Sequence, residues 1–213
     1  MEFLDEALEE YVENHSSEES EVLEDLNRTT QAKVLQPRML SGHLQGRALS
    51  MLSKMIQPKQ ILEIGTYTGY SAICLAEGLQ EGGELHTIDI NEELEDMVKS
   101  YCRKAGFENQ IIQHIGNAID LVPKLNKSWD LIFIDADKSN YLNYYNMLIE
   151  KLPSGSYIIA DNVLWSGKVL QKNEEMDIDT AAIDTFNKFI QKDERVENVL
   201  FPIRDGLMVC RKK

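Results

Sequence analysis

The stretch "LEIGTYTGYS", Leu62 to Ser71, follows a short apolar run and opens a helical pattern, and it decides the fold. A glycine-containing turn between a strand and a helix is the setting in which α/β sheets bind nucleotides. The turn lacks the G-x-G-x-x-G spacing, since Tyr67 stands where a second glycine would let a pyrophosphate approach. Glu63, just before the turn, would also repel phosphate. The turn therefore favours a ligand that carries positive charge over a dinucleotide.

The rest of the chain predicts a mostly parallel sheet. From residue 60 onward, short apolar runs alternate with helical patterns: "QILEIG", "ELHTIDI", "QIIQHI", "WDLIFID" and "GSYIIAD". Such near-continuous apolar runs, separated by segments long enough for a crossover helix, are typical of parallel strands that are covered on both faces. The last two runs, "RVENVLFPI" and "GLMVCRK", are joined by a turn at 204–206 that is too short for a crossover, so they predict an antiparallel hairpin. We therefore predict an α/β sandwich.

Three helices are predicted before the first strand. Residues 2–14 place apolar side chains on one helical face, namely Phe3, Leu4, Ala7, Leu8, Tyr11 and Val12. Ser16 and Glu19 predict a capping box that opens a second helix to about Ala32. "GHLQGRALSMLSKMI" predicts a third helix that ends before Pro58. We expect a single domain over residues 1–213, with 1–57 as an N-terminal helical extension and 58–213 as the α/β core.

Composition and charge exclude several classes of partner. The formal net charge of −14 opposes nucleic acid, because binding a phosphate backbone requires clustered Lys and Arg. No apolar run of about 18 residues could cross a bilayer, and the N-terminus is acidic where a signal peptide would be basic, so we expect a cytoplasmic protein without a membrane partner. Cys74, Cys102 and Cys210 form no C-x-x-C pair and are interpreted as buried hydrophobes. His86 and His114 lie inside predicted strands and are interpreted as structural.

Acidic and small residues collect where the predicted strands end. In doubly wound sheets, ligands bind outside the carboxyl ends of the strands. Asp89 ends the second strand and would accept hydrogen bonds from ribose hydroxyls, and "GNA" at 116–118 follows the third strand and leaves room for a flat base. Together with Glu63, these positions favour S-adenosylmethionine, which carries an ammonium and a sulfonium but no phosphate. The alternative is that Gly65 and Gly69 only permit tight packing of strand and helix.

Two carboxylates and an amide follow the fourth and fifth strands. Asp135 and Asp161 each end an apolar run, and Asn162 adds a carbonyl oxygen. These hard ligands suit Mg²⁺, whereas zinc or iron would fit worse because no His or Cys is at hand. Lys138 lies three residues after Asp135 and is either an ordinary surface lysine or a general base. A divalent cation beside it would disfavour its ammonium form, which suits a base.

Four motifs in this order, "LEIGTYTGYS", "TIDIN", "FIDADKSNYLNYY" and "IIADNVLWSG", resemble those of the cation-dependent O-methyltransferase family. That family includes plant caffeoyl-CoA O-methyltransferases and, more distantly, catechol O-methyltransferase; this chain is most similar to bacterial-type members. The similarity extends from about residue 20 to the end of the chain. It implies the class I S-adenosylmethionine-dependent methyltransferase sandwich, with a seven-stranded, mostly parallel, Rossmann-like sheet and one antiparallel strand, and commonly a homodimer.

The resemblance also implies the site residues and the reaction. Asp135, Asp161 and Asn162 would hold Mg²⁺, or another divalent cation such as Mn²⁺ or Ca²⁺, and Lys138 would be the catalytic base. The residues implied to contact S-adenosylmethionine are Ser41, Glu63, Gly65, Thr66, Ser71, Asp89, Ala118 and Asp137. The implied activity is methyl transfer to a hydroxyl of a catechol-type phenol. Trp165 would either line the binding site of the aromatic substrate or pack against its own loop.

The chain departs from the plant members at two places. The segment "GHLQGR", at 42–47, stands where plant enzymes resemble "S-x-D-E-G-Q", and this departure concerns the lid contacts to the cofactor. The acidic N-terminal region offers no basic cluster for a CoA ester, so a small phenol is expected, with a caffeoyl-CoA-type ester as the alternative. A nucleotide-dependent dehydrogenase is opposed by Tyr67 and Glu63. A non-catalytic S-adenosylmethionine-binding module would lack the metal set or the base, and this chain has both.

Overall fold

A computed structural model describes residues 5–213, which form two compact units: an N-terminal unit that ends at Asn126 and a C-terminal unit, Lys127–Lys213. Phe3 and Leu4, which were predicted for the first helix, lie outside the described residues. No helix among residues 5–213 is both long enough and apolar enough to span a membrane. The cytoplasmic location, the homodimer and the single domain over the whole chain stay predictions.

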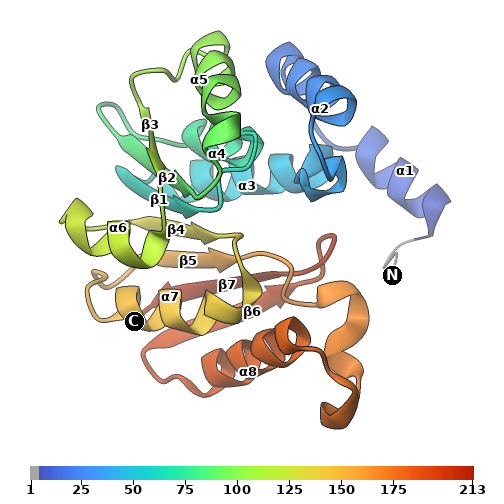
Figure 1. Ribbon diagram of the computed structural model, residues 1–213, viewed down its shortest axis with the longest axis vertical. Coiled ribbons are helices and arrows are strands. Elements are labelled where there is room, and N and C mark those ends of the chain that lie inside the picture. Colours follow the sequence, from blue (N-terminus) through green and yellow to red (C-terminus); the bar gives the residue numbers. More distant parts are fainter. Residues whose placement is uncertain (1–4) are drawn as a thin grey trace. The chain divides into compact units, whose positions relative to one another are not determined.

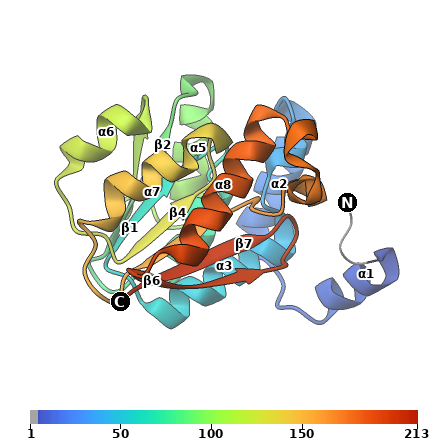
Figure 2. The ribbon, with the colours of Figure 1, turned by 90° about the horizontal axis from the view of Figure 1, so that it is seen from below.

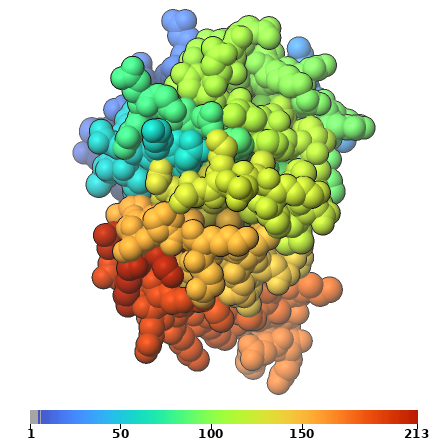
Figure 3. Space-filling model, turned by 90° about the vertical axis from the view of Figure 1, so that its left-hand side faces the viewer, coloured from blue at the N-terminus to red at the C-terminus, as the bar shows by residue number. Residues whose placement is uncertain are grey.

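The N-terminal unit begins with helices and continues with three parallel strands (Figure 1). Its elements are α1 (Glu6–Asn14), α2 (Glu21–Lys33), η1 (Pro37–Met39), α3 (Gly42–Ile56), β1 (Gln60–Ile64), α4 (Tyr70–Ala76), β2 (Glu84–Asp89), η2 (Glu92–Leu94), α5 (Glu95–Lys104), β3 (Ile111–Ile115) and α6 (Ala118–Leu125). Figure 2 shows α3 and α6 on opposite faces of these strands. In the space-filling view α6 lies at the surface (Figure 3). Ala118 and Val122 of this helix are buried. The predicted parallel strands and the third helix are confirmed.

The predicted start of the second helix is wrong by one turn. Ser20, and not Ser16, caps α2, because its hydroxyl accepts a hydrogen bond from the backbone N–H of Leu23. Ser16 instead lies two residues beyond the end of α1, where its hydroxyl donates to the carbonyl of Val12. The segment "SSEES" contains three serines beside acidic residues, so local propensity alone could not select the cap. Leu23 and Leu26 of α2 are fully buried, which fixes where this helix begins.

A half-buried ion pair joins α3 to the end of α4. Arg47 donates two hydrogen bonds to the Glu77 carboxylate, at 2.8 and 3.1 Å, and Ser50 and Lys54 donate to the same group at 2.7 and 2.8 Å. The two helices also approach closely, since a Cβ atom built on Gly46 would lie 2.6 Å from the Tyr70 ring. These contacts fasten α3 to the helix that opens after the glycine turn.

Glu77 should make the stability of this unit depend on pH. Burial alone would raise the pKa of Glu77, but hydrogen bonds from Arg47, Lys54 and Ser50 outweigh burial and lower its pKa to about 2. A lowered folded-state pKa stabilises the protein above the unfolded value of about 4.5, and this stabilisation is lost as the pH falls toward about 2. We expect Glu77→Gln to lower the free energy of unfolding at neutral pH by on the order of 2 kcal/mol and to flatten the loss of stability in acid. Urea denaturation over a pH series measures both.

The exposed Glu81→Gln is the matched control for this prediction, because it removes one carboxylate a few residues away. It should leave both the free energy of unfolding and its pH dependence as in the unsubstituted protein. Equal acid dependence in the Glu77 variant and the unsubstituted protein would show that the ion pair does not contribute as described.

The C-terminal unit carries the rest of the sheet and two helices that lie side by side (Figures 1 and 2). Its elements are β4 (Leu131–Ile134), η3 (Lys138–Asn140), α7 (Tyr141–Ile149), β5 (Tyr157–Ala160), η4 (Trp165–Leu170), η5 (Asn173–Glu175), α8 (Ile178–Lys192), β6 (Val196–Phe201) and β7 (Leu207–Lys212). β4 and β5 are parallel, whereas β7 is antiparallel to both β5 and β6. The strand order is β3-β2-β1-β4-β5-β7-β6. The predicted seven-stranded, mostly parallel sheet with a C-terminal hairpin is confirmed.

The interpretations of the cysteines and histidines agree with the structure. All three cysteines are buried and free, and burial raises the pKa of each thiol to about 12. His86 and His114 stack across neighbouring strands, with ring centroids 5.1 Å apart and Nδ1 of the first 2.9 Å from Nε2 of the second. Burial lowers the pKa of His114. The two rings satisfy each other inside the sheet, which matches the prediction that they are structural.

Candidate active site

The glycine turn after β1 is tight and is closed by backbone hydrogen bonds. Gly65 has a φ of 104° and donates its N–H to the carbonyl of Ile88 at 2.9 Å. Gly69 has a φ of 87° at the start of α4, where a Cβ would come within 3.2 Å of Val98. Tyr67 adopts a φ of 49°, which a residue other than glycine adopts at some cost. The turn therefore holds the end of β1 against β2 in a fixed shape.

Asp89 fastens the end of β2 to this turn. Its Oδ2 accepts hydrogen bonds from the backbone N–H groups of Thr66, at 3.0 Å, and Tyr67, at 2.7 Å. Its Oδ1 accepts from the N–H of Asn91 at 2.9 Å. An ionised carboxylate has about four acceptor sites, so Asp89 can accept a further hydrogen bond from a ligand hydroxyl. The geometry suits the ribose contact that was predicted for it.

Glu63 is fully buried beneath the turn and is held by hydroxyl groups. Ser71 donates to Oε1 at 2.6 Å and Thr87 donates to Oε2 at 2.5 Å. The hydroxyl of Thr66 lies 2.5 Å from that of Thr87. The structure thus brings together three of the predicted site residues, and it adds Thr87, which the strand pattern alone did not single out. The buried carboxyl group therefore lies beneath the turn with one hydroxyl donor on each of its oxygens.

Ser41 and Ala118 are both less than one-tenth exposed and belong to the same unit. Ser41 immediately precedes α3, and Ala118 is the first residue of α6. The segment that leads to Ser41 is bonded to the glycine turn, because the Tyr67 hydroxyl lies 3.4 and 3.3 Å from the carbonyl oxygens of Leu35 and Gln36. We refer to Glu63, Gly65, Thr66, Ser71 and Asp89 as the turn cluster, whereas the predicted contacts of Ser41 and Ala118 with S-adenosylmethionine stay predictions.

A second group, the lysine cluster, lies in the C-terminal unit and consists of Asp135, Lys138, Tyr141, Asp161 and Asn162. Lys138 Nζ donates to Asp135 Oδ1 at 2.9 Å, to Asn162 Oδ1 at 2.7 Å and to the Tyr141 hydroxyl at 2.6 Å. These three bonds use all three ammonium hydrogens. Only 8% of Lys138 is exposed, so the alternative of an ordinary surface lysine is wrong. β4, whose four residues are fully buried, gives this cluster a rigid support.

The three predicted metal ligands offer oxygens of the right chemistry. Asp135 Oδ1 and Asn162 Oδ1 converge on one point, because both accept from the same Nζ, and this point already receives a cationic group. Asp161 is 3% exposed and its Oδ1 accepts from the backbone N–H of Asn162 at 2.6 Å. No group of three or more His, Cys, Asp or Glu that could hold a metal occurs among residues 5–213. The predicted ligand set has only two carboxylates, from Asp135 and Asp161, and its third oxygen donor is the amide of Asn162. This all-oxygen composition fits a hard divalent cation.

Tyr141 belongs to this cluster but was not predicted. It is fully buried, and its hydroxyl donates to the main-chain carbonyl of Asp161 at 3.0 Å while it accepts from Lys138. Burial raises the pKa of Tyr141 well above its ordinary value, and the nearby carboxylates of Asp135 and Asp161 raise it further. The phenol is therefore protonated at neutral pH. The three-residue spacing from Lys138 was the available signal, because residues i and i+3 share a face of a helical turn.

Asp137 and Trp165 flank the lysine cluster. The Asp137 carboxylate accepts from the Tyr144 hydroxyl at 2.6 Å, so its orientation is fixed, and its contact with S-adenosylmethionine stays a prediction. Lys138 Nζ lies 5.6 Å from the centroid of the Trp165 ring. Trp165 has a φ of 48° and Ser166 a φ of 53°, so the backbone of the loop that carries the ring is conformationally constrained. The ring thus lies beside the lysine cluster, which agrees both with contact to an aromatic substrate and with packing of its own loop.

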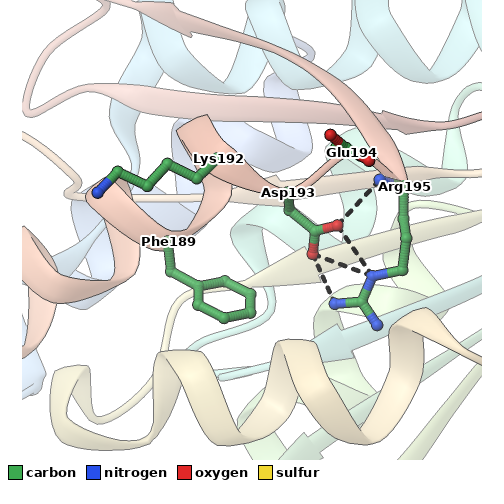
Figure 4. Close-up of a pocket in the computed structure, with 5 residues that line it drawn as sticks. All are labelled: Phe189, Lys192, Asp193, Glu194 and Arg195. Atoms are coloured by element: carbon green, nitrogen blue, oxygen red, sulfur yellow. Dashed lines mark hydrogen bonds and ion pairs between the residues drawn. The ribbon is translucent and has the colours of Figure 1, made fainter.

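One surface pocket of the C-terminal unit contains none of the predicted residues. It is lined by Phe189, Lys192, Asp193, Glu194 and Arg195, where α8 turns into β6 (Figure 4). The Arg195 guanidinium binds the Asp193 carboxylate, and this ion pair lowers the pKa of Asp193. The charged groups of the pocket therefore hold a turn together, and the pocket is not a candidate active site.

Comparisons with known proteins identify the family of this chain. The sequence profile of a family described as O-methyltransferase matches residues 13–213. A caffeoyl-CoA O-methyltransferase of Stellaria longipes is 32% identical over 204 residues, which cover 91% of this chain and 84% of the relative. One from Medicago sativa is 35% identical over 207 residues, which cover 91% of this chain and 83% of the relative.

Solved structures with the same fold include two with SAH bound. A methyltransferase of Podospora anserina aligns with a TM-score of 0.89 at 25% identity and covers 100% of this chain and 98% of its own. An O-methyltransferase of Bacillus cereus aligns with a TM-score of 0.88 at 29% identity and covers 97% of both chains. The expected class I methyltransferase fold is thereby confirmed. With a matched family profile over almost its whole length and relatives above 30% identity, this chain belongs to the O-methyltransferase family.

Proposed function

We propose that this protein transfers the methyl group of S-adenosylmethionine to one hydroxyl of a catechol-type phenol, with Mg²⁺ or a similar divalent cation as cofactor. The observation that carries the proposal is the buried Lys138, whose Nζ contacts oxygens of both Asp135 and Asn162. A lysine amine beside paired oxygen ligands can, in its neutral form, take the proton of a hydroxyl next to a hard cation.

The turn cluster supports S-adenosylmethionine as the methyl donor. Asp89 has acceptor capacity left for a ribose hydroxyl, and the Glu63 carboxyl group lies below the turn, which favours a cationic ligand. The turn does not favour a phosphate-bearing nucleotide, because the Tyr67 side chain occupies the position of the second glycine and both amides at 66 and 67 already donate to Asp89. The dehydrogenase alternative is therefore set aside.

In the lysine cluster, Asp135, Asp161 and Asn162 would hold the divalent cation. The cation, when bound, would withdraw electron density from the acceptor oxygens and hold a vicinal diol in one orientation. Lys138 Nζ, as the neutral amine, accepts the proton of the attacking hydroxyl. The oxygen forms a bond to the methyl carbon while the bond from sulfur to that carbon breaks, and S-adenosylhomocysteine leaves. Positioning of the nucleophile supplies most of the rate enhancement in such a displacement.

The proposed acceptor is a small phenol with two neighbouring hydroxyls. The N-terminal helices α1 and α2 contain many exposed acidic side chains, which would repel the phosphates of a CoA ester. The second candidate is a caffeoyl-CoA-type ester, because the plant relatives carry that name. Both acceptors present the same vicinal diol, so the chemistry proposed for Lys138 serves either.

The test compares methyl transfer to a simple catechol, to its isomer with the hydroxyls in meta positions, and to caffeoyl-CoA. We expect turnover of the catechol and no measurable turnover of the meta isomer, because only neighbouring hydroxyls can share one cation. Equal rates with the meta isomer would contradict the vicinal-diol requirement. A much higher kcat/KM for caffeoyl-CoA than for the catechol would select the second candidate.

Asp89→Ala should weaken the binding of S-adenosylmethionine by about 10-fold or more, because a hydrogen bond to a charged group contributes roughly 1.5–3 kcal/mol. The same change leaves two amides of the turn without an acceptor, so a fall in melting temperature is also expected. Titration calorimetry with S-adenosylhomocysteine measures the affinity. Glu92→Ala, at an exposed position three residues away, is the control and should bind normally. Normal affinity in the Asp89 variant would remove this residue from the cofactor site.

A further inference from the structure

Tyr141 contacts both Lys138 and the main chain of Asp161, yet no step of the reaction has been assigned to it. We propose that the Tyr141 hydroxyl is a positioning group that holds Lys138 Nζ in place while a divalent cation occupies the oxygens of Asp135 and Asn162. The proposal rests on the function proposed above and adds a residue to it. Tyr141 acts through the lysine and does not itself accept the proton of the substrate.

The Tyr141 hydroxyl makes one hydrogen bond as an acceptor and one as a donor. Its oxygen accepts from Lys138 Nζ at 2.6 Å, and a neutral amine, which keeps two N–H groups, can donate the same bond. The single phenol hydrogen is then free to be donated to the carbonyl oxygen of Asp161 at 3.0 Å. The two hydrogen bonds thus run in the same direction, from Lys138 to Tyr141 and from Tyr141 to the carbonyl oxygen of Asp161 after β5. They connect the proposed base to the backbone that carries the ligands Asp161 and Asn162.

The Tyr141 ring itself has little freedom to move. It is fully buried at the start of α7 and packs edge-to-face against Phe186 of α8, with ring centroids 5.7 Å apart and planes at 84°. Lys138 opens the 3₁₀ turn that leads into α7, and in such a turn residues i and i+3 lie one above the other. The fold thus places the hydroxyl at the end of the lysine side chain.

Tyr141 differs from the other two acceptors of Lys138 in one respect that matters for the reaction. Asp135 and Asn162 are proposed ligands of the cation, so their oxygens cannot be relied on to hold the lysine when a cation is bound. The phenol oxygen is not among the proposed ligands and stays available. A lysine has a flexible four-carbon stem, and without this partner its amine would sample several positions. A displacement of about 1 Å in a reacting group can reduce the rate about 10²-fold.

The test is Tyr141→Phe, which removes only the hydroxyl, with Tyr145→Phe as the matched control. Tyr145 lies one turn further along α7, its ring also packs against Phe186, and its hydroxyl donates to Asp193 at 2.9 Å, outside the lysine cluster. Both variants lose one hydroxyl from the same helix. We expect kcat to fall about 10- to 100-fold in the Tyr141 variant alone, with affinity for S-adenosylhomocysteine unchanged in both. Melting temperatures show whether both variants fold.

A second measurement does not depend on activity. Lys138 is labelled with acetic anhydride in the presence of Mg²⁺, and its modification is quantified by mass spectrometry relative to other lysines. We expect Lys138 to react several-fold faster in the Tyr141 variant than in the unsubstituted protein, and the Tyr145 variant to show no change. Unchanged labelling, or equal losses of kcat in both variants, would overturn the proposal. If the unsubstituted protein methylates no phenol, the proposed function fails, while the labelling still decides whether Tyr141 holds Lys138.

Discussion

Lys138→Met is expected to lower kcat for methyl transfer by about 10²- to 10⁴-fold, which is the range over which a positioned general base contributes. Methionine preserves much of the length and apolar volume of the lysine stem but cannot accept a proton. The affinity for S-adenosylmethionine should not change, because the hydrogen bonds of Lys138 go to Asp135, Tyr141 and Asn162, which are not predicted to bind the methyl donor. Steady-state kinetics with a catechol, together with calorimetry for the methyl donor, separate the two effects.

Lys168→Met is the control for this variant. Lys168 also lies over the Trp165 ring, with Nζ 5.9 Å from the ring centroid, but it is half exposed and pairs with Asp177. Its replacement removes one positive charge from η4, the segment that carries Trp165, and leaves the oxygens of Asp135 and Asn162 in place. We expect kcat close to that of the unsubstituted protein. A Lys138 variant that kept the full rate over neutral pH would refute its role as the base.

Asp135→Ala is expected to lower kcat by about 10³-fold, because the electrostatic contribution of a catalytic cation is several kcal/mol and about 1.36 kcal/mol corresponds to a tenfold change. The variant should also bind Mg²⁺ or Mn²⁺ more weakly, which calorimetry can measure without any turnover. Binding of S-adenosylhomocysteine should stay intact, since β1 and β2 and their turn are unaffected.

Two further variants sharpen this prediction. Asp135→Asn keeps an oxygen donor and loses the charge, so part of its activity should return as the Mg²⁺ concentration is raised. Asp184→Ala on α8 removes a carboxylate whose ion pair is with Lys188, a residue outside the lysine cluster, and should leave kcat and cation affinity unchanged. If Asp135→Ala retained full activity, Asp135 would not be a cation ligand.

The order of elements in this fold could be predicted from the sequence because its strands are nearly continuous apolar runs. The four residues of β4 are all fully buried, and this is the pattern that "LIFI" predicts for a strand covered on both faces. The short turn around Arg204 likewise left only a hairpin as the connection between β6 and β7. The cap of α2 could not be predicted, because the choice between Ser16 and Ser20 depends on which turn buries Leu23 and Leu26.

The candidate site was predictable to the extent that its residues stand at strand ends. Asp89, Asp135 and Asp161 each follow an apolar run, so the general rule for α/β sheets identified them. Tyr141 and Thr87 were not predicted, because the sequence pattern does not distinguish a tyrosine in a helix or a threonine inside a strand from an ordinary core residue. Only the three-dimensional contacts show that their hydroxyls bind Lys138 and Glu63. The burial of Lys138 also depends on tertiary packing.

The central claim is that a divalent cation and S-adenosylmethionine act together on a vicinal diol. The most direct test measures transfer of a labelled methyl group from S-adenosylmethionine to a catechol with Mg²⁺, and again with an excess of chelator. We predict methylated product in the first reaction, none above background in the second, and recovery when Mg²⁺ is restored. Turnover that the chelator does not diminish would contradict the account.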